Sequence, residues 1–304
     1  MLRQKDFSIE SLGKPEVKSP LELSTVRGDG LVNFIEPGKT VPYRLTTAGK
    51  DDRLAFEAAG PRQMIYFHPE DVHAAVMTCG GLCPGLNDAI RAIVMQLHYK
   101  YKVKKITGIL FGQKGLDPNR GRKPIELTPE KVKHIHNRGG SFLGTSRGRV
   151  PSETIVDTLQ ELGINILISL GGDGTQKGNH QICEEIKKRG AEIALVGLPK
   201  TIDNDISFVF KTFGLDTAVT IARDAVLSAH NEAESAYNGI GLVKVMGRHS
   251  GFIAALTSLA AQDVNFCLIP EVPFDLDGRG AFLDSLKKRV KDRHHAVIVA
   301  AEGA

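Results

Sequence analysis

The sequence lacks several features that define whole classes of protein. It has only four cysteines in 304 residues, too few for the disulfide framework of a small secreted protein. It has no run of about 18 apolar residues, so we expect no membrane span. Its first twenty residues lack the apolar centre of a signal peptide. We therefore expect a protein of the reducing cytoplasm with no membrane partner.

The chain also lacks a large excess of positive or negative charge. The formal net charge is +4, which is too mild to indicate a nucleic-acid partner but is compatible with a small anionic substrate. Apolar residues make up 41% of the chain and charged residues 24%. This balance is ordinary for a folded protein and excludes wholesale disorder.

Short apolar runs alternate with amphipathic stretches from residue 72 onward. Most of the runs are apolar throughout, which is typical of strands buried on both faces. Thr128 before Pro129 is typical of a helix start. The alternation predicts an α/β fold with mostly parallel sheets. The expected strands are 72–77, 106–110, 164–170, 193–196, 240–245, 266–269 and 296–301, and the expected helices are 86–98, 129–137, 152–162, 175–189, 215–232, 250–261 and 280–291.

The first 70 residues follow a different pattern. They contain scattered proline and glycine, few long apolar runs, and a polar stretch at 46–53. We expect an extension that packs over the core, with short strands near 31–34 and 64–67.

Glycine-rich turns follow two of the expected strands. Segment 78–87 contains two adjacent glycines, and segment 171–175 reads Gly-Gly-Asp-Gly-Thr. A helix start offers unpaired N–H groups and the positive end of a dipole, so such turns can bind phosphate. Asp173 could hold Mg²⁺, and Lys177 adds a positive charge. A tight turn is the alternative for the first segment and a capped helix start for the second; we favour phosphate and metal only for the second.

The turn after the fourth expected strand, residues 197–205, carries two carboxylates. Asp203 and Asp205 lie close to Lys200 and Thr201. This set suits proton abstraction beside a phosphoryl group, although an ordinary polar turn fits equally well.

Two further segments combine glycine with arginine, residues 144–149 and 246–251. The second indicates an anion site at a helix start, and a solvated loop is the alternative for the first. Pro-Gly-Lys-Thr at 37–40 imitates part of a P-loop but precedes Val-Pro, where a helix should begin. Cys79 and Cys83 have no second pair at zinc spacing, so we expect buried thiols.

Five of these segments together, in their order and separation, resemble the phosphofructokinase family. The resemblance covers about residues 60–304 and is strongest to its longer, plant-type ATP-using branch, which is related to pyrophosphate-dependent enzymes. It implies two Rossmann-like three-layer α/β/α domains with mostly parallel sheets. These would be a nucleotide-binding domain at 71–207 and a sugar-phosphate-binding domain at 208–304, preceded by the extension at 1–70. The five segments are 78–87, 144–149, 171–175, 199–205 and 246–251.

The resemblance implies a role for each matching residue. Asp203 would take the proton from the 1-hydroxyl of fructose 6-phosphate, Arg147 would lie near the transferred group, and Asp173 would hold Mg²⁺. The residues expected at ATP are Gly81, Arg147, Gly148, Gly172, Asp173, Gly174 and Thr175, with Lys177 added for its charge. The residues expected at the sugar phosphate are Thr201, Ile202, Asp203, Met246, Gly247, Arg248 and Glu302.

Two positions bear on the phosphoryl donor. Pyrophosphate users in this family typically carry Asp where this chain has Gly174, and they share Lys200. The plant-type branch combines that lysine with glycine, so the resemblance implies ATP, with pyrophosphate as the alternative. Gln113 departs from the pattern, since the family usually has Tyr there, beside the nucleotide.

The implied activity is that of a glycolytic 6-phosphofructokinase, in a homo-oligomer (dimer or tetramer) of the allosteric kind. An NAD or lipid kinase, which shares Gly-Gly-Asp-Gly-Thr, and a non-catalytic regulatory subunit are less favoured alternatives. The chain stops at Ala304, whereas family members continue for roughly another domain, so we expect a fragment or a natural truncation.

Overall fold

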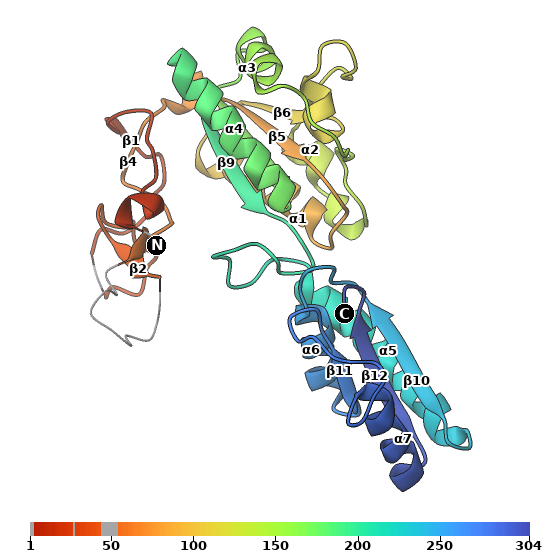
Figure 1. The fold of residues 1–304 in the computed structure, drawn as a ribbon. Coiled ribbons are helices and arrows are strands. Elements are labelled where there is room, and N and C mark those ends of the chain that lie inside the picture. The colour runs from red at the N-terminus through yellow and green to blue at the C-terminus, as the bar shows by residue number, and fades with distance from the viewer. Residues whose placement is uncertain (1–2, 27, 44–53) are drawn as a thin grey trace.

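The structure is a computed structural model that describes residues 3–26, 28–43 and 54–304. The chain forms two separate sheets covered by helices, and an N-terminal portion beside the first sheet (Figure 1). The polar stretch predicted at 46–53 lies outside the described residues.

The first sheet has five strands, in the spatial order β7 (Ile125–Glu126), β6 (Lys105–Ile109), β5 (His73–Thr78), β8 (Ile166–Gly171) and β9 (Ala194–Pro199). All neighbours are parallel except β7, which pairs antiparallel with β6. Four of these strands match those expected from the apolar runs, and the short edge strand β7 was not predicted.

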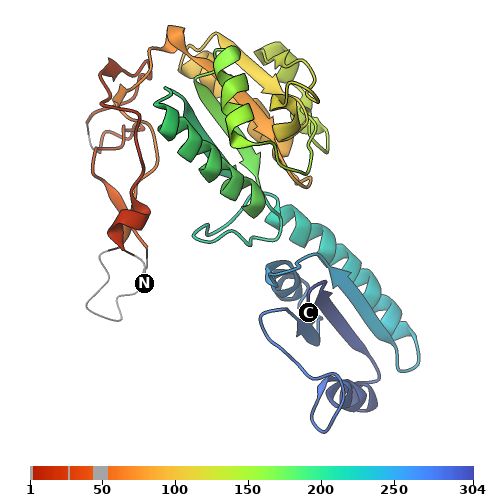
Figure 2. The ribbon, with the colours of Figure 1, turned by 45° about the horizontal axis from the view of Figure 1, so that its top comes forward.

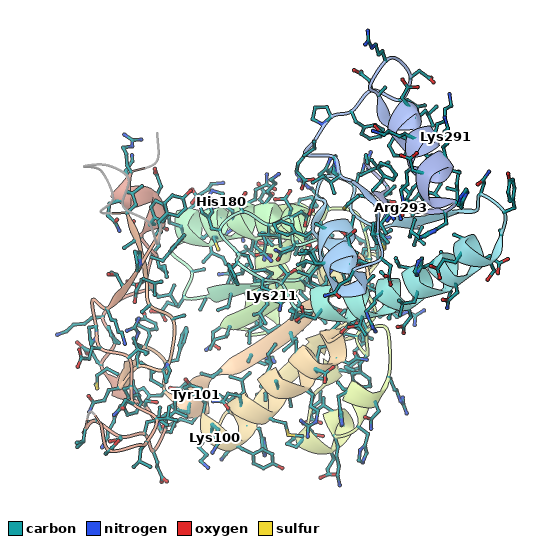
Figure 3. The ribbon with its side chains drawn as sticks, turned by 90° about the horizontal axis from the view of Figure 1, so that it is seen from below. Lys100, Tyr101, His180, Lys211, Lys291 and Arg293 are labelled. Carbon is teal, nitrogen blue, oxygen red and sulfur yellow. The ribbon has the colours of Figure 1, made fainter. Side chains whose placement is uncertain are left out.

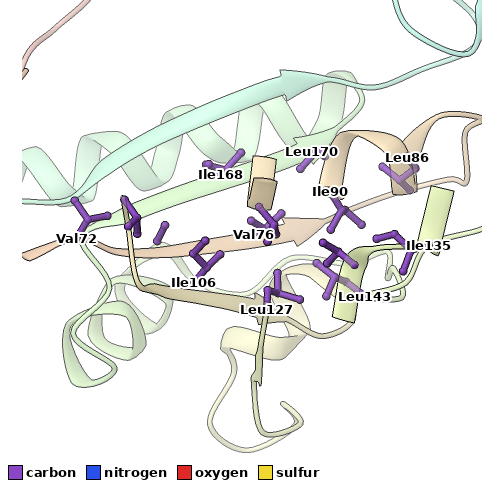
Figure 4. Packing of buried hydrophobic residues seen from close by; sticks show 14 residues of the cluster. Val72, Val76, Leu86, Ile90, Ile106, Leu127, Ile135, Leu143, Ile168 and Leu170 are labelled. Atoms are coloured by element: carbon purple, nitrogen blue, oxygen red, sulfur yellow. The ribbon is translucent and has the colours of Figure 1, made fainter. Parts of the chain in front are cut away.

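Helices cover both faces of this sheet. One face packs against α1 (Leu86–Met95) and α2 (Pro129–Val132), the other against α3 (Ser152–Glu161) and α4 (Asp173–Arg189). Side chains of the central β5 alternate between the two faces: Ala74 and Val76 join the α1 core (Figure 4), and Ala75 and Met77 join the α4 core. Buried Ile90 of α1 contributes about 1.5–3 kcal/mol by leaving water, so these cores hold the layers together.

The second sheet is parallel, in the order β10 (Ile240–Val245), β12 (Ala296–Ala301) and β11 (Phe266–Leu268). One face packs against α5 (Leu215–Ser235) and α6 (Phe252–Ala261), the other against α7 (Phe282–Arg293) (Figure 2). The α/β class with three layers and mostly parallel sheets is therefore confirmed. The boundary that we predict at residue 207 falls between β9 and α5, and it stays a prediction.

Two helix predictions need correction. The helix expected at 86–98 ends at Met95 and continues as a π-helical turn, η3 (Gln96–Lys100). The helix expected at 129–137 starts as predicted, with the Thr128 side chain accepting the Lys131 N–H. It breaks because His134 has non-helical φ and ψ (−118°, 7°), and a separate 3₁₀ turn, η5 (Ile135–Asn137), follows.

Among its described residues, the N-terminal portion contains two small antiparallel pairs of strands. β1 (Val17–Lys18) pairs with β4 (Met64–Ile65), and β2 (Thr40–Pro42) pairs with β3 (Ala55–Glu57). The strand expected at 31–34 is wrong, since only one bridge joins Asn33 to Ser24. The ring of Phe208, in the loop after β9, contacts three rings of this portion, those of Phe7, Tyr43 and Phe56.

Within the three described ranges, no helix has both the length and the apolar composition needed to cross a membrane.

Candidate active site

Three loops meet at one edge of the first sheet because β8 lies between β5 and β9 and is parallel to both. They open into a cavity of about 600 Å³. Most of the predicted site residues line it, together with Met246 at the end of β10 in the second sheet. The predicted residues found there are Gly81, Arg147, Gly148, Gly172, Asp173, Gly174, Thr175, Lys200, Thr201, Ile202, Asp203 and Met246.

The loop after β5 is held in place from two sides. The Gly80 N–H donates to the Ser146 carbonyl at 3.2 Å, and the Thr145 hydroxyl donates to the Gly80 carbonyl at 2.5 Å. The Lys200 ammonium donates to the Gly81 carbonyl at 2.5 Å. A Cβ on Gly81 would meet nothing within 4 Å. The loop is therefore fixed but leaves open space beside Gly81.

Lys200 is a buried cation at the end of β9, with a relative exposure of 4%. Burial lowers the pKa of its ammonium, because leaving water disfavours the charged form. Its backbone N–H donates to the Gly171 carbonyl at 3.0 Å. Lys200 thus ties the end of β9 to both the β5 and β8 loops.

The Gly-Gly-Asp-Gly-Thr segment forms the end of β8 and the first turn of α4. The helix begins at Asp173, two residues before the predicted start, so Asp173 and Gly174 lie where helix N–H groups lack intrahelical partners. The Asp173 carboxylate pairs with Lys177 at 2.8 Å, and both side chains are exposed. A Cβ on Gly174 would meet nothing within 4 Å, and its φ is not positive. The protein itself therefore does not require glycine at 174.

Asp203 presents its carboxylate from a backbone fixed on both sides. Its N–H donates to the Thr201 hydroxyl at 3.1 Å, and its carbonyl accepts the Ser250 hydroxyl at 2.6 Å. Its Oδ1 is buried and has no hydrogen-bond partner in the described part of the chain. Burial, and then the charges of Asp205 and Glu302, raise the pKa of Asp203, whereas His249 acts in the opposite direction. A half-buried carboxylate with a raised pKa and a free oxygen can accept a proton.

The ends of β10 and β12 meet beside Asp203. The Glu302 N–H donates to the Val245 carbonyl at 2.9 Å. Gly247 has a φ of +122°, and a Cβ there would collide with the Ser250 carbonyl oxygen. A Cβ on Gly303 would collide with the Arg248 carbonyl oxygen. Both glycines are needed for these two strand ends to approach one another.

Four predicted residues do not line the cavity: Lys177, Gly247, Arg248 and Glu302. Lys177 reaches it through its ion pair with Asp173. Glu302 is exposed, yet its charge raises the pKa of Asp203, which places it on the same edge. Arg248 is exposed beside the cavity and Gly247 is buried.

Asp205, Gln113 and Gly178 also line the cavity, outside the sets predicted for ATP and the sugar phosphate. From the sequence, Asp205 is noted only as the second carboxylate beside Asp203. Gln113 is noted only as a departure from the family pattern, and Gly178 is not noted at all. Asp205 lines it, and the pairing of Asp205 with Asp203 was the available signal. Gln113 and Gly178 line it together, because a Cβ on Gly178 would lie 3.1 Å from Gln113 Nε2. No local pattern marks Gly178, which lies in the second turn of α4.

Comparisons with known proteins agree with this architecture. The family model described as Phosphofructokinase matches residues 73–304. An ATP-dependent 6-phosphofructokinase of Borreliella burgdorferi is 50% identical over 98% of this chain and 69% of its own length. ATP-dependent 6-phosphofructokinase 1 of Arabidopsis thaliana is 48% identical over 98% of this chain and 63% of its own. A solved phosphofructokinase from Saccharomyces cerevisiae is 29% identical with a TM-score of 0.65, covering 77% of this chain and 34% of that one.

The fold and the cavity define a class: an α/β protein that opens its ligand cavity at the carboxyl ends of parallel strands. Within that class, the chain belongs to the phosphofructokinase family. It spans about half to two thirds of the length of the curated relatives that it matches, from 45% to 69%.

Proposed function

We propose that the protein is an ATP-dependent 6-phosphofructokinase. It transfers the γ-phosphoryl group of ATP to the 1-hydroxyl of fructose 6-phosphate, giving fructose 1,6-bisphosphate and ADP. The observation that carries the proposal is that Asp173 and Asp203 line one cavity, the second with a buried, unpartnered carboxylate oxygen. The names of the relatives from Borreliella burgdorferi and Arabidopsis thaliana support ATP as the donor.

The residues around Asp173 fit a magnesium ion. Mg²⁺ is usually held by one or two carboxylates together with the phosphates of the substrate. The Asp173 carboxylate is exposed, and the adjacent Gly174 leaves open space beside it. Its pair with Lys177 is also exposed, so it contributes little and opens at small cost. Asp173 would hold the ion, which neutralises phosphate charge when bound.

Asp203 is the base in this proposal. Its carboxylate accepts the proton of the 1-hydroxyl, and its raised pKa makes it a stronger base than an exposed aspartate. Phosphoryl transfer passes through a loose transition state, so positioning and charge neutralisation supply most of the rate enhancement. The hydrogen bonds that the Asp203 backbone donates to Thr201 and accepts from Ser250 supply positioning, and Arg147 at the cavity wall supplies positive charge.

The remaining predicted residues divide between the two substrates. The loops that carry Gly81, Gly148, Gly172 and Thr175 line the phosphate end of the cavity, where backbone N–H groups bind anions. The sugar phosphate is assigned to Thr201, Ile202, Met246, Gly247, Arg248 and Glu302.

The choice of ATP over pyrophosphate depends on Gly174 and Lys200. At position 174, neither steric contact with neighbouring atoms nor the backbone φ requires glycine. We therefore infer that the absence of a side chain there leaves room for the nucleotide. The Lys200 ammonium is already bound to the Gly81 carbonyl. This hydrogen bond gives Lys200 a structural role, so the presence of the lysine does not require pyrophosphate as the phosphoryl donor.

A coupled assay of fructose 1,6-bisphosphate formation on the full gene product tests the proposal. ATP should support turnover and pyrophosphate should not. Gly174→Asp should lower kcat/KM for ATP by about 100-fold, or 2.7 kcal/mol in transition-state binding, and Gly174→Ala should lower it far less. A wild type that prefers pyrophosphate to ATP as the donor would refute the proposal. So would one that phosphorylates NAD or diacylglycerol in preference to fructose 6-phosphate.

Cytoplasmic location and a homo-oligomeric, allosteric enzyme belong to the same proposal. In the described part of the chain, which contains all four cysteines, every cysteine is free, and this supports a reducing compartment.

A further inference from the structure

A cluster of histidine and carboxylate side chains lies at the other end of the second sheet. His230 and Glu234 are four residues apart on α5 and so share one face of the helix. His295 immediately precedes β12. One potential ligand atom from each of these three residues lies within 4.8 Å of the other two. The imidazole rings of His230 and His295 are 5.5 Å apart between centroids.

One hydrogen bond and two longer contacts with carboxylates indicate how the imidazole rings are oriented. The His295 Nδ1 lies 3.1 Å from the Arg293 carbonyl oxygen. A carbonyl only accepts, so Nδ1 carries the hydrogen and Nε2 keeps a lone pair. The His230 Nδ1 lies 3.6 Å from an Asp263 carboxylate oxygen, and its Nε2 lies 3.6 Å from a Glu234 carboxylate oxygen. Asp263 is therefore placed to hold the hydrogen on Nδ1, which directs the Nε2 lone pair toward Glu234.

We propose that His230, Glu234 and His295 bind one divalent transition-metal ion of the zinc class, with Asp263 as a positioning residue for His230. Imidazole nitrogen and carboxylate oxygen are zinc donors at about 2.0–2.2 Å. A tetrahedral ion holds such atoms about 3.4 Å apart, so small side-chain rotations close the site from the present spacing. A carboxylate that orients a ligating histidine is the usual outer partner of such sites.

The burial of the cluster suits an ion that enters from solvent. The side chain of His230 is 17% exposed and that of Glu234 is 53% exposed. The guanidinium of Arg289 donates to the His295 carbonyl at 3.2 Å rather than to a side chain of the cluster. Its charge lowers the expected affinity without blocking the ligand atoms.

The cluster is separate from the cavity that contains Asp173. His295 precedes β12 and Glu302 follows it, and a strand of this length spans about 20 Å. A bound ion would join α5 to β12 across their packed faces and stabilise the second sheet. The donors also differ in kind: the cavity offers carboxylates suited to Mg²⁺, and the cluster offers two imidazoles that Mg²⁺ does not favour.

Calorimetric titration of the metal-free, untagged full chain with ZnCl₂ tests the inference. The wild type should bind one equivalent, and millimolar Mg²⁺ should not displace it. Glu234→Gln and His295→Asn should each weaken binding at least tenfold, and Asp263→Asn should weaken it about 10- to 100-fold. Zinc should raise the melting temperature of the wild type and not that of the two ligand variants.

Matched controls separate this cluster from other zinc donors. His294→Asn changes the adjacent histidine, whose ring lies 3.3 Å from the Asn238 side chain, and should leave binding unchanged. His180→Asn, on α4, should also leave it unchanged, and Figure 3 shows His180 far from α7, which carries Lys291 and Arg293. Cys267→Ser removes the exposed thiol and should have no effect.

Three outcomes would overturn the proposal. The first is that the wild type fails to bind zinc at millimolar concentration. The second is that Glu234→Gln and His295→Asn bind zinc as tightly as the wild type does. The third is that Cys267→Ser abolishes binding that both of these variants retain. Glu234 is exposed and His295 half-buried, so the decision does not depend on replacing the more buried His230.

Discussion

Glycines line the cavity and also lie beside it at the ends of β10 and β12, but the two groups serve different purposes. At the proposed nucleotide end, which contains Asp173, a Cβ on Gly81 or Gly174 would meet nothing within 4 Å. Beside the proposed sugar end, which contains Asp203, a Cβ on Gly247 or Gly303 would collide with a backbone carbonyl. The difference teaches that a cavity-lining glycine without a steric or conformational reason in the protein indicates space kept for a ligand, whereas a glycine with such a reason indicates a requirement of the fold.

The charged groups differ in the same way. Arg147, Asp173 and Lys177 at the nucleotide end are exposed. Asp203, which we assign to the sugar end, is half-buried, and its backbone is hydrogen-bonded to the side chains of Thr201 and Ser250. The nucleotide end therefore offers exposed charge to an exchanging ligand, and the sugar end holds one carboxylate at a fixed place.

The largest expected effect separates the two carboxylates. Asp203→Ser should lower kcat about 10²- to 10⁴-fold, because it removes the base, and should leave ATP affinity nearly unchanged. The matched variant Asp173→Asn should weaken MgATP binding. Steady-state kinetics and equilibrium nucleotide binding measure both variants. Near-normal turnover of Asp203→Ser would exclude Asp203 as the base.

The next effect tests the two classes of glycine on stability. Gly247→Ala should lower the free energy of unfolding by about 1–3 kcal/mol, since alanine disfavours a φ of +122° and its methyl group would collide with the Ser250 carbonyl. Gly174→Ala should change it by less than about 0.5 kcal/mol. Denaturant unfolding measures both, and equal losses would end the distinction between the two ends.

Much of this arrangement follows from local sequence. Apolar runs predict β5, β8, β10 and β12 to within two residues, and β9 to within three, because strands buried on both faces need apolar side chains on both. The parallel order of the first three strands then brings the segments of Gly81, Asp173 and Asp203 together, as predicted.

Other parts depend on contacts that no local pattern encodes. The bond from Lys200 to Gly81 joins residues 119 positions apart. From the sequence, His295 is only a polar residue before an expected strand. It contacts His230 because α5 packs on β12. The contact of Phe208 with Phe7 likewise exists only after the N-terminal portion has folded against the loop after β9. All three contacts therefore depend on tertiary packing.

A smaller effect is expected where the sugar end holds the Asp203 backbone. Ser250 is buried, and its hydroxyl donates to the Asp203 carbonyl at 2.6 Å. Ser250→Ala leaves that carbonyl without the hydroxyl and should lower the free energy of unfolding by about 1 kcal/mol. It should lower kcat more than it changes KM for ATP, because the base loses its positioning. A rise in KM for ATP at unchanged kcat would place Ser250 at the nucleotide end instead.

The smallest effect is on pH dependence, and its sign is fixed by the charges around Asp203. The base works only when ionised, so turnover falls as the pH drops through its pKa. The Asp205 carboxylate raises the pKa of Asp203 and His249 lowers it. Asp205→Asn should therefore move the acid limb of the kcat profile to lower pH, and His249→Asn should move it to higher pH. Stopped assays across the acid range measure both variants. Shifts in the same direction would mean that the acid limb reports a group other than Asp203, because the pKa of Asp203 responds to these two charges with opposite signs.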